Sequence, residues 1–339
     1  MPKKFTLIFV TLTILLTATA LIFWYLLSSN QANPLPEQRE PKFKPQFSQK
    51  PSLQKPNSTT TTPKPSNSPT ASPTPKPQEA TITQATKDNL GYSENDKKAQ
   101  TLLDSGAYVL NISNPNTFAV VWEPKTKPTR LLVLLHGTDG KAYYEVADEL
   151  SEAQKHSYTL VGLQWFNKES KTYMTASQIM SALNPVLEYL KTQKGITPQI
   201  YVLHGFSRGS AVSYEVTHLD QNDKNWFTGT ANMSGGIPIN SKIEAKSANP
   251  SADLFFSKLN AGTLGSSAYN NHHFFMYCGM KDEEWGTEMC EQFQNARKLM
   301  EGSGGIVDIF IADPSGKHMG FRSNPDTRKQ FISWFTTLN

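Results

Sequence analysis

The chain is 339 residues long, with 37% hydrophobic residues, 18% charged residues and a net charge of +4. Residues 1–30 hold only two charges, both of them lysines, and residues 31–80 carry a net charge of +4. Subtracting both contributions leaves residues 81–339 with a net charge of −2. A nucleic-acid-binding domain would cluster lysine and arginine on its folded part. The charge distribution therefore argues against nucleic acid as a partner.

An apolar segment opens the chain. Phe5–Leu27 contains 23 residues without a charge. As a helix it would be roughly 34 Å long, enough to cross the core of a bilayer. Ala18–Ala20 resembles a signal-peptide cleavage site, but the apolar run continues beyond it. Two lysines precede the segment and no basic residue follows it before Arg39. We therefore predict a single-pass membrane anchor over residues 1–30, with its N-terminus in the cytoplasm and the rest of the chain outside.

The next segment, residues 31–87, has the composition of a disordered tether. Of the 22 prolines in the chain, 12 lie between Gln31 and Ala80, in a stretch without Trp or Tyr. Such a stretch cannot bury enough apolar surface to offset the entropy lost on ordering it. Residues 88–339 remain, about 250 residues in all, which suits one domain with a sizeable core.

The pattern within residues 88–339 alternates short β-rich runs with longer helical stretches, which is typical of a mainly parallel sheet. Several of the runs are continuously apolar, as expected of strands covered on both faces. The expected strands are Ala107–Ile112, Phe118–Trp122, Arg130–Leu135, Tyr158–Leu163, Gln199–Leu203, Phe227–Met233, His273–Cys278 and Ile306–Ile311. The expected helices are Ala142–Lys155, Ala176–Thr192, Ser210–His218, Thr287–Met300 and Thr327–Thr337. We predict an α/β fold with a mainly parallel eight-stranded sheet and helices on both faces.

The sharpest motif is Gly205–Gly209, which has the form G-x-S-x-G with Ser207 at its centre. In such an elbow the serine occupies a strained turn, and the two glycines leave room where any side chain would clash. The five-residue pattern alone is weak, because a chain of this length can match it by chance. Here an expected strand precedes it and an expected helix follows it, as the geometry of an elbow demands.

Residues from about Tyr108 to the C-terminus resemble an α/β-hydrolase fold domain. Four segments match that family in its own order, with Ser, Asp and His following one another along the chain. They are the His-Gly loop Leu134–Thr138, the Ser207 elbow, the Gly-x-x-Asp turn that ends Phe274–Asp282 and the Gly-x-His loop that ends Asp308–His318.

Within that family the plain elbow and the His-Gly loop resemble those of the polyhydroxybutyrate-depolymerase-like, feruloyl-esterase-like and dienelactone-hydrolase-like esterases. Thr138 and Asp139 stand where some lipases have Gly-Gly, so a hormone-sensitive-lipase type is not expected. The resemblance implies hydrolysis of a carboxylic ester.

The residue types themselves point to nucleophilic catalysis. A serine hydroxyl is a poor nucleophile at neutral pH, so it needs a base within hydrogen-bond reach and a third group that orients the base. We predict Ser207 as nucleophile, His318 as base and Asp282 as orienting acid. The oxyanion formed on the attacked carbonyl needs two donors, for which the backbone N–H groups of Thr138 and Arg208 are best placed.

Other residues compete for these roles. Glu283 and Glu284 lie in the same turn as the predicted acid, and Asp313 precedes the predicted base by only a few residues. A run of acids can equally be a helix N-terminus that complements the helix dipole. His272 is the reserve candidate for the base.

Aromatic residues that follow expected strands are candidates for substrate contact, because open α/β sheets bind ligands at the carboxyl ends of their strands. Tyr143, Trp165 and Trp285 are the candidates for stacking on a sugar or an aromatic acyl group, and packing within loops is the alternative. The side chain of Arg208 would either bind a carboxylate of the substrate or form a structural salt bridge.

The two cysteines, Cys278 and Cys290, leave a disulfide and two buried thiols as alternatives. Neither has a partner at zinc-ligand spacing, and no glycine-rich phosphate loop follows a strand, so no metal or cofactor is expected. The tether suggests a polymeric or envelope-associated ester as substrate. Two further functions stay open: a serine peptidase on the same fold, and a surface binding module without catalysis.

Overall fold

The computed structural model describes residues 82–84, 97–237 and 250–339. Within these ranges no helix is both long enough and apolar enough to cross a membrane. The segment Phe5–Leu27 and most of the expected tether lie outside them. The membrane anchor therefore stays a prediction from sequence.

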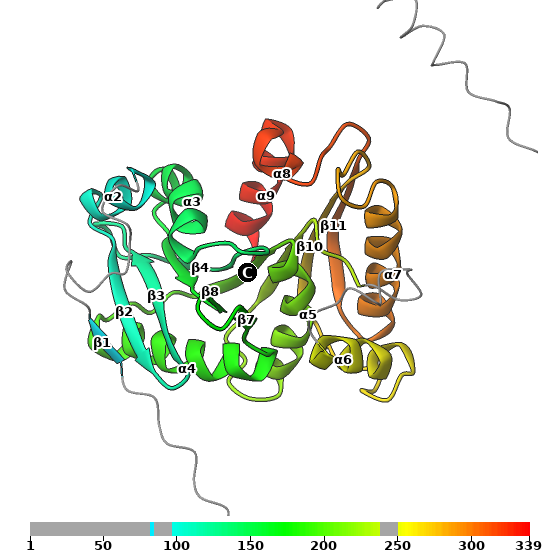
Figure 1. The fold of residues 1–339 in the computed structure, drawn as a ribbon, viewed down its shortest axis with the longest axis horizontal. Helices are drawn as coiled ribbons and strands as arrows, with labels where there is room; N and C mark the ends of the chain where they lie inside the picture. Colours follow the sequence, from blue (N-terminus) through cyan, green and yellow to red (C-terminus); the bar gives the residue numbers. More distant parts are fainter. Residues whose placement is uncertain (1–81, 85–96, 238–249) are drawn as a thin grey trace, which may run out of the picture. The chain divides into compact units, whose positions relative to one another are not determined.

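The main sheet has nine strands, and its centre and one side are parallel (Figure 1). In spatial order the strands are β1 (Ile82–Gln84), β2 (Tyr108–Ser113), β3 (Asn116–Trp122), β5 (Thr159–Leu163), β4 (Arg130–Leu135), β8 (Ile200–Phe206), β9 (Gly229–Met233), β10 (His273–Gly279) and β11 (Ile306–Asp313). The strands from β5 to β11 pair in parallel, whereas β1, β2 and β3 pair antiparallel. The mainly parallel α/β sheet expected from the sequence is thus confirmed.

The prediction of eight strands was wrong by one, because β1 joins the edge of the sheet. Ile82 pairs with Ile112 and Gln84 with Leu110, in antiparallel register with β2. A strand of three residues is too short for hydrophobic alternation to reveal it. It lies inside residues 31–87, so the sheet begins before the boundary expected between tether and domain.

Helices cover both faces of the sheet (Figure 1). On one face lie α2 (Lys97–Asp104), α3 (Ala142–His156), α8 (Gly320–Ser323) and α9 (Pro325–Thr337), whose buried residues share one cluster. On the other face lie α4 (Ala176–Gln193), α5 (Arg208–Gln221), α6 (Pro250–Asn260) and α7 (Glu288–Gly302). The three buried clusters form the core on either side of the sheet.

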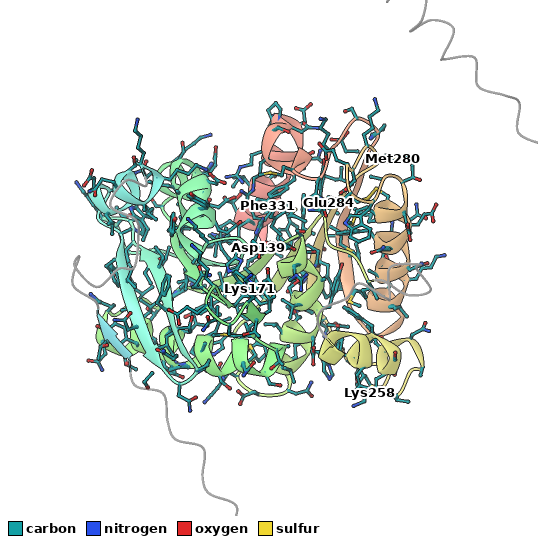
Figure 2. The ribbon with its side chains drawn as sticks, viewed as in Figure 1. Asp139, Lys171, Lys258, Met280, Glu284 and Phe331 are labelled. Carbon is teal, nitrogen blue, oxygen red and sulfur yellow. A yellow bond between two sulfur atoms is a disulfide. The ribbon has the colours of Figure 1, made fainter. Side chains whose placement is uncertain are left out.

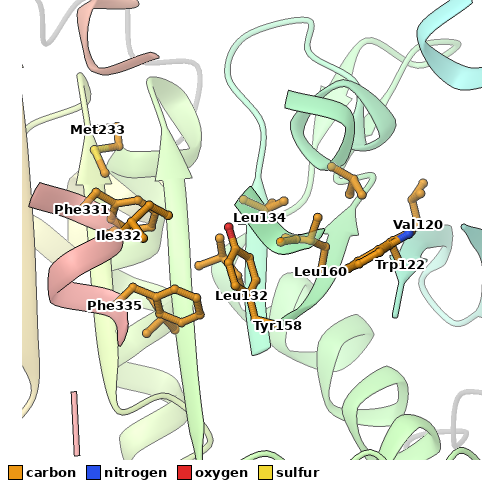
Figure 3. Packing of buried hydrophobic residues seen from close by; sticks show 14 of the residues in the cluster. Val120, Trp122, Leu132, Leu134, Tyr158, Leu160, Met233, Phe331, Ile332 and Phe335 are labelled. Carbon is orange, nitrogen blue, oxygen red and sulfur yellow. The ribbon is translucent and has the colours of Figure 1, made fainter. Parts of the chain in front are cut away.

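The central strand β4 shows why its sequence is continuously apolar. Leu132 and Leu134 join the cluster that contains α3 and α9, whereas Leu131, Val133 and Leu135 join the cluster that contains α4 and α5. Successive side chains of a strand point to opposite faces, so a strand covered on both faces must be apolar at every position. Figure 3 shows the first of these clusters, with side chains of β4 and α9 labelled. Each such fully buried side chain stabilises the fold by about 1.5–3 kcal/mol.

Two arginines tie the C-terminal helices to α3. Arg322 of α8 pairs with Glu145 and Asp148, and Arg328 of α9 pairs with Glu149 through both terminal nitrogens. Glu145 and Glu149 are buried, so each carboxylate depends on its arginine for compensation. These pairs fix α8, which directly follows the loop after β11.

A separate two-stranded hairpin, β6 (Phe166–Asn167) and β7 (Thr172–Tyr173), follows β5. Strands of two residues lie below the length at which sequence patterns predict them. The hairpin matters for the site because the phenol oxygen of Tyr173 accepts the backbone N–H of Asp139, on the loop after β4, at 2.7 Å.

Candidate active site

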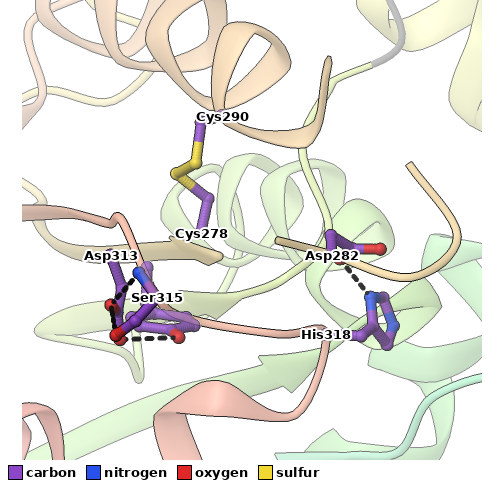
Figure 4. Close-up of a disulfide and its surroundings, with 7 residues drawn as sticks. Cys278, Asp282, Cys290, Asp313, Ser315 and His318 are labelled. Atoms are coloured by element: carbon purple, nitrogen blue, oxygen red, sulfur yellow. Dashed lines mark hydrogen bonds and ion pairs between the residues drawn. A yellow bond between two sulfur atoms is a disulfide. The ribbon is translucent and has the colours of Figure 1, made fainter. Parts of the chain in front are cut away.

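Three side chains meet at the carboxyl edge of the sheet. Ser207 follows β8, Asp282 lies in the turn after β10, and His318 lies in the loop after β11. His318 Nε2 lies 2.9 Å from Ser207 Oγ, and His318 Nδ1 lies 2.6 Å from Asp282 Oδ2. Figure 4 shows the contact between Asp282 and His318. Open α/β sheets bind their ligands at this edge, so the three groups lie where a substrate would approach.

The turn at Ser207 is held by close approach of neighbouring backbones. Its φ of 53° and ψ of −117° are rarely adopted by residues other than glycine. The N–H of Ser207 donates to the carbonyl of Met233 at 2.8 Å. A Cβ at Gly205 would overlap the carbonyl oxygen of Gly209, and a Cβ at Gly209 would overlap that of Leu135. Both glycines of the motif are therefore required by the packing of β4, β8 and α5.

The carboxylate of Asp282 is buried and oriented by backbone donors. Its side chain is 0% exposed. Oδ1 accepts the N–H groups of Glu284 at 2.9 Å and Trp285 at 3.0 Å, which leaves Oδ2 for His318. Hydrogen bonds from two backbone donors hold a carboxylate in one orientation. The acid is thus fixed independently of the imidazole.

A disulfide ties the loop that carries Asp282. Cys278, near the end of β10, is bonded to Cys290 in α7, with their Cα atoms 5.3 Å apart (Figure 4). The sequence left this pairing open, and the structure forms it. The turn after β10 is consequently joined covalently across its two ends.

The imidazole of His318 lies in a partly enclosed, negatively charged environment. Its side chain is 13% exposed, and its ring centroid lies 5.3 Å from that of Phe206. Burial lowers the pKa of His318, but the hydrogen bond and charge of Asp282 and the charges of Glu284 and Glu283 raise it by more. The net effect is a raised pKa, which means that the imidazolium is stabilised.

Asp313 and Glu283, two of the acids that competed with Asp282 for the orienting role, have other partners. Asp313 accepts the N–H and hydroxyl of Ser315, both at 3.0 Å (Figure 4). It also accepts the amide of Asn324 at 2.9 Å. Glu283 Oε2 accepts the backbone N–H of His318 at 3.0 Å. Asp313 therefore shapes the loop after β11, and Glu283 holds its backbone, while neither contacts the imidazole.

The two residues expected to supply the oxyanion donors, Thr138 and Arg208, belong to segments that adjoin Ser207. Arg208 is the first residue of α5, so its N–H has no partner within the helix. A Cβ at Gly137 would lie 3.1 Å from the Cβ of Ser207, which places the residue before Thr138 against Ser207. Arg208 Nε donates to Thr138 Oγ1 at 3.3 Å and joins the two segments. Figure 2 shows this edge with Asp139, the next residue after Thr138, labelled.

Two of the residues expected to contact substrate have buried side chains that no substrate can reach. Tyr143 is 4% exposed and Trp165 is 0% exposed, because both rings pack into the clusters on the faces of the sheet. The indole N–H of Trp165 donates to the carbonyl of His136 at 3.1 Å, which allows its full burial. The proposal of substrate stacking is thus corrected for both. Trp285 is partly exposed, and its contact with substrate stays a prediction.

The remaining buried histidines are structural. His272, the reserve candidate for the base, directly precedes β10 and so lies at the opposite end of the strand from Asp282. Its Nε2 lies 2.8 Å from the hydroxyl of Thr230, and burial lowers its pKa to about 3. Burial also lowers the pKa of His136 to about 4 and that of His204 to about 3. Over the described part of the chain, no three His, Cys, Asp or Glu residues cluster as metal ligands would.

Two contributors to the site were not predicted from the sequence. A Cβ at Gly235 would overlap the carbonyl oxygen of Ser207, so the elbow also depends on the segment that follows β9. The run Ser-Gly-Gly after an expected strand was the available signal for it. Phe206 packs on His318 and lies 4.8 Å from the guanidinium of Arg322, and no sequence signal marks that role.

No protein-family model matches the chain, and no curated protein matches it in sequence. Solved structures do match. An esterase of the fungus Rhizomucor miehei matches with a TM-score of 0.52 and 14% identity, over 71% of this chain and 88% of that one. A bifunctional GH43-CE protein of Bacteroides eggerthii matches with a TM-score of 0.51 and 14% identity, over 64% of this chain and 33% of that one.

The chain has the α/β-hydrolase fold. Identities of 14% establish the fold and not the activity, so the chemistry available to this chain depends on its own side chains. In the α/β-hydrolase fold the nucleophile stands on a strand-to-helix turn at the top of the sheet, and Ser207 occupies that turn between β8 and α5.

Proposed function

We propose that this α/β-hydrolase is a serine hydrolase that cleaves carboxylic esters through an acyl-serine intermediate. The observation that carries the proposal is the continuous hydrogen-bonded series from Ser207 Oγ through His318 to Asp282. A nucleophile, a base within hydrogen-bond reach and an acid that orients the base are the three parts that serine acyl transfer requires.

In the first half-reaction, Ser207 Oγ attacks the carbonyl carbon of the ester while its proton passes to His318 Nε2. The resulting oxyanion accepts hydrogen bonds from the backbone N–H groups of Thr138 and Arg208. Such donors typically lower the barrier by about 3–4 kcal/mol each. The bond from carbon to the alcohol oxygen then breaks, and His318 gives its proton to the leaving alcohol. Asp282 stabilises the imidazolium that exists between these two transfers.

In the second half-reaction, water enters the position that the alcohol left. His318 removes a proton from the water as its oxygen attacks the acyl carbon. The bond to Ser207 Oγ breaks, the serine regains a proton from His318, and the carboxylic acid is released. The same imidazole therefore serves twice, which suits a group whose partner on Nδ1 does not change.

We further propose that the hydrolase domain lies outside the cytoplasm, held by the apolar segment Phe5–Leu27 and the proline-rich tether. The bond between Cys278 and Cys290 supports this location, since structural disulfides persist in oxidising compartments. A catalytic domain held at a distance from a membrane suits a polymeric or carbohydrate-linked ester in the cell envelope.

The backbone of His318 offers a test of positioning. Replacing Glu283 with alanine is expected to lower kcat for short aryl esters by about 2- to 10-fold with little change in KM. The reason is that the backbone N–H of His318 loses its acceptor, so the imidazole is held less firmly. Steady-state kinetics on the purified full-length chain measures the effect.

The matched control is Glu284→Ala, at the residue labelled in Figure 2. Each substitution removes one of the negative charges that raise the pKa of His318, but only Glu283 accepts its backbone N–H. Both variants should shift the acid limb of the pH profile downward, and only Glu283→Ala should lower kcat at its plateau. Equal plateaus in the two variants would show that the hydrogen bond has no role in catalysis.

The proposed activity is tested by covalent labelling. A fluorophosphonate probe should modify Ser207 of the folded full-length chain in detergent, and mass spectrometry of the digest should locate the adduct there. A panel of short aryl esters should compete with the probe and be turned over. Failure of the folded protein to react would contradict catalysis and favour a binding module. Faster turnover of matched amides than of esters would identify a peptidase instead.

A further inference from the structure

The residue after the nucleophile carries a positive charge that no carboxylate of the described chain neutralises. Arg208 Nε donates to Thr138 Oγ1 at 3.3 Å, and its guanidinium carbon lies 4.3 Å from the ring centroid of Tyr173. Across the described residues, neither terminal nitrogen of Arg208 has a hydrogen-bond partner and the group forms no ion pair. The structural salt bridge offered as one role for Arg208 is therefore not formed.

The guanidinium is nevertheless held in one place. The ring of Tyr173 supports its flat face, and this ring is itself fixed against Trp165 and Phe166 at centroid distances of 4.9 and 4.6 Å. The hydroxyl of Tyr173 is engaged with Asp139, which accepts from it at 3.3 Å. A long, flexible side chain loses rotamer entropy when it is held in this way. Here that loss is incurred without an internal ion pair to offset it.

The position is also electrostatically unfavourable without an anion. Arg208 begins α5, whose first turn contains no acidic residue. The N-terminus of a helix carries partial positive charge, so a cation there is destabilising unless an anion is nearby. Local arrangements that conflict with their surroundings are typical of functional sites. An anion supplied from outside the chain would resolve this conflict.

We infer that Arg208 binds a carboxylate on the acyl part of the substrate, an inference that rests on the proposed ester hydrolysis. A guanidinium whose Nε is engaged still presents two terminal nitrogens, and a planar carboxylate can accept hydrogen bonds from both. The substrate class is thus esters in which the acyl group is itself an acid, such as half-esters of dicarboxylic acids.

The topology assigns the carboxylate to the acyl side. Thr138 and Tyr173 follow β4 and β5, which lie on one side of β8 in the sheet. Asp282 and His318 follow β10 and β11, on the other side. Because His318 must protonate the leaving alcohol, the alcohol lies toward β10 and β11. The acyl group then extends toward the side of β4, where the guanidinium is held.

The test compares two esters that differ only in charge. The probes are 4-nitrophenyl hydrogen adipate and its neutral methyl ester, with glutarate and suberate homologues to vary the reach. For the full-length chain, kcat/KM should favour the acidic ester by about 10- to 100-fold, since hydrogen bonds between charged groups are the strong ones. Raising the ionic strength should reduce this preference.

Arg208→Gln should reduce the ratio of the two kcat/KM values to about one. The ratio is the readout because any general loss of activity at this residue cancels in it. Arg208→Lys keeps the positive charge but lacks the two terminal nitrogens of the guanidinium, so it should retain part of the preference. This variant tests the proposal even if the glutamine variant folds poorly. Lys168→Gln removes a positive charge from the neighbouring β6–β7 hairpin and should leave the ratio unchanged.

Each outcome decides between the two proposals. Equal turnover of the acidic and neutral esters by the unmodified chain would overturn the role of Arg208 and leave ester hydrolysis intact. A preference that survives Arg208→Gln, or that Lys168→Gln removes equally, would also overturn it. Absence of turnover of either ester, in protein that fails to react with a fluorophosphonate, would overturn the proposed hydrolysis itself.

Discussion

Replacing Ser207 with alanine is expected to lower kcat for short aryl esters by about 10⁴- to 10⁶-fold. The variant retains the imidazole and the backbone donors but has no oxygen 2.9 Å from His318 Nε2 to attack the carbonyl. The fold should be preserved, because among the described residues the hydroxyl of Ser207 is hydrogen-bonded only to the imidazole, and the turn is held by backbone contacts. Initial rates across a range of ester concentrations measure the effect.

The matched control is Ser181→Ala. Ser181 lies exposed on α4, and its hydroxyl donates to the carbonyl of Ser177 within the helix. It should retain full activity and fluorophosphonate labelling. Groups that act as a unit are not additive, so His318→Ala alone and Ser207→Ala with His318→Ala should each lose about as much as Ser207→Ala alone. Activity above roughly 1% in purified Ser207→Ala protein would contradict an acyl-serine intermediate.

The three side chains of the site could be named from the sequence because each one follows the end of an expected strand by a few residues. In a parallel sheet the carboxyl ends of the strands meet at one edge, so Ser207, Asp282 and His318 had to lie near one another once β8, β10 and β11 were recognised. The strained turn could be predicted as well, since the two glycines of the motif report the close approach of neighbouring backbone.

The orientation of aromatic side chains could not be predicted in this way. Tyr143 and Trp165 both come after the carboxyl end of a strand, but position along the chain does not determine the direction in which a side chain points. Tyr143 lies in the first turn of α3 and faces the sheet, and Trp165 satisfies its indole N–H with a buried carbonyl. Both outcomes depend on tertiary packing that hydrophobic periodicity does not encode.

Contacts between distant loops could not be predicted from the sequence either. Glu283 was considered only as a rival acid, whereas it accepts the backbone N–H of His318 from another loop. The Arg208 guanidinium is held against the ring of Tyr173, which lies in a hairpin whose strands are two residues long. Such pairings join segments with no shared local pattern, so only the folded arrangement reveals them.

Replacing Asp282 with asparagine is expected to lower kcat/KM near neutral pH by about 10⁴-fold. The amide would still accept the backbone N–H groups of Glu284 and Trp285 through its oxygen, which leaves its NH₂ group facing His318 Nδ1. The imidazole would then carry its proton on Nε2, where it cannot accept the proton of Ser207. The loss therefore comes from the wrong tautomer and not from unfolding.

The same substitution should move the pH profile. Burial alone lowers the pKa of His318, and the hydrogen bond and charge of Asp282 are the main causes that raise it. Activity requires the neutral imidazole, so in the unmodified chain kcat/KM should fall, as the pH decreases, at a pH above that of an ordinary histidine. In Asp282→Asn the residual activity should fall at a lower pH, because burial then dominates. Asp139→Asn, at a carboxylate that does not contact His318, should leave the midpoint unchanged, whereas a midpoint that stays in place in Asp282→Asn would show that Asp282 does not set the basicity of the imidazole.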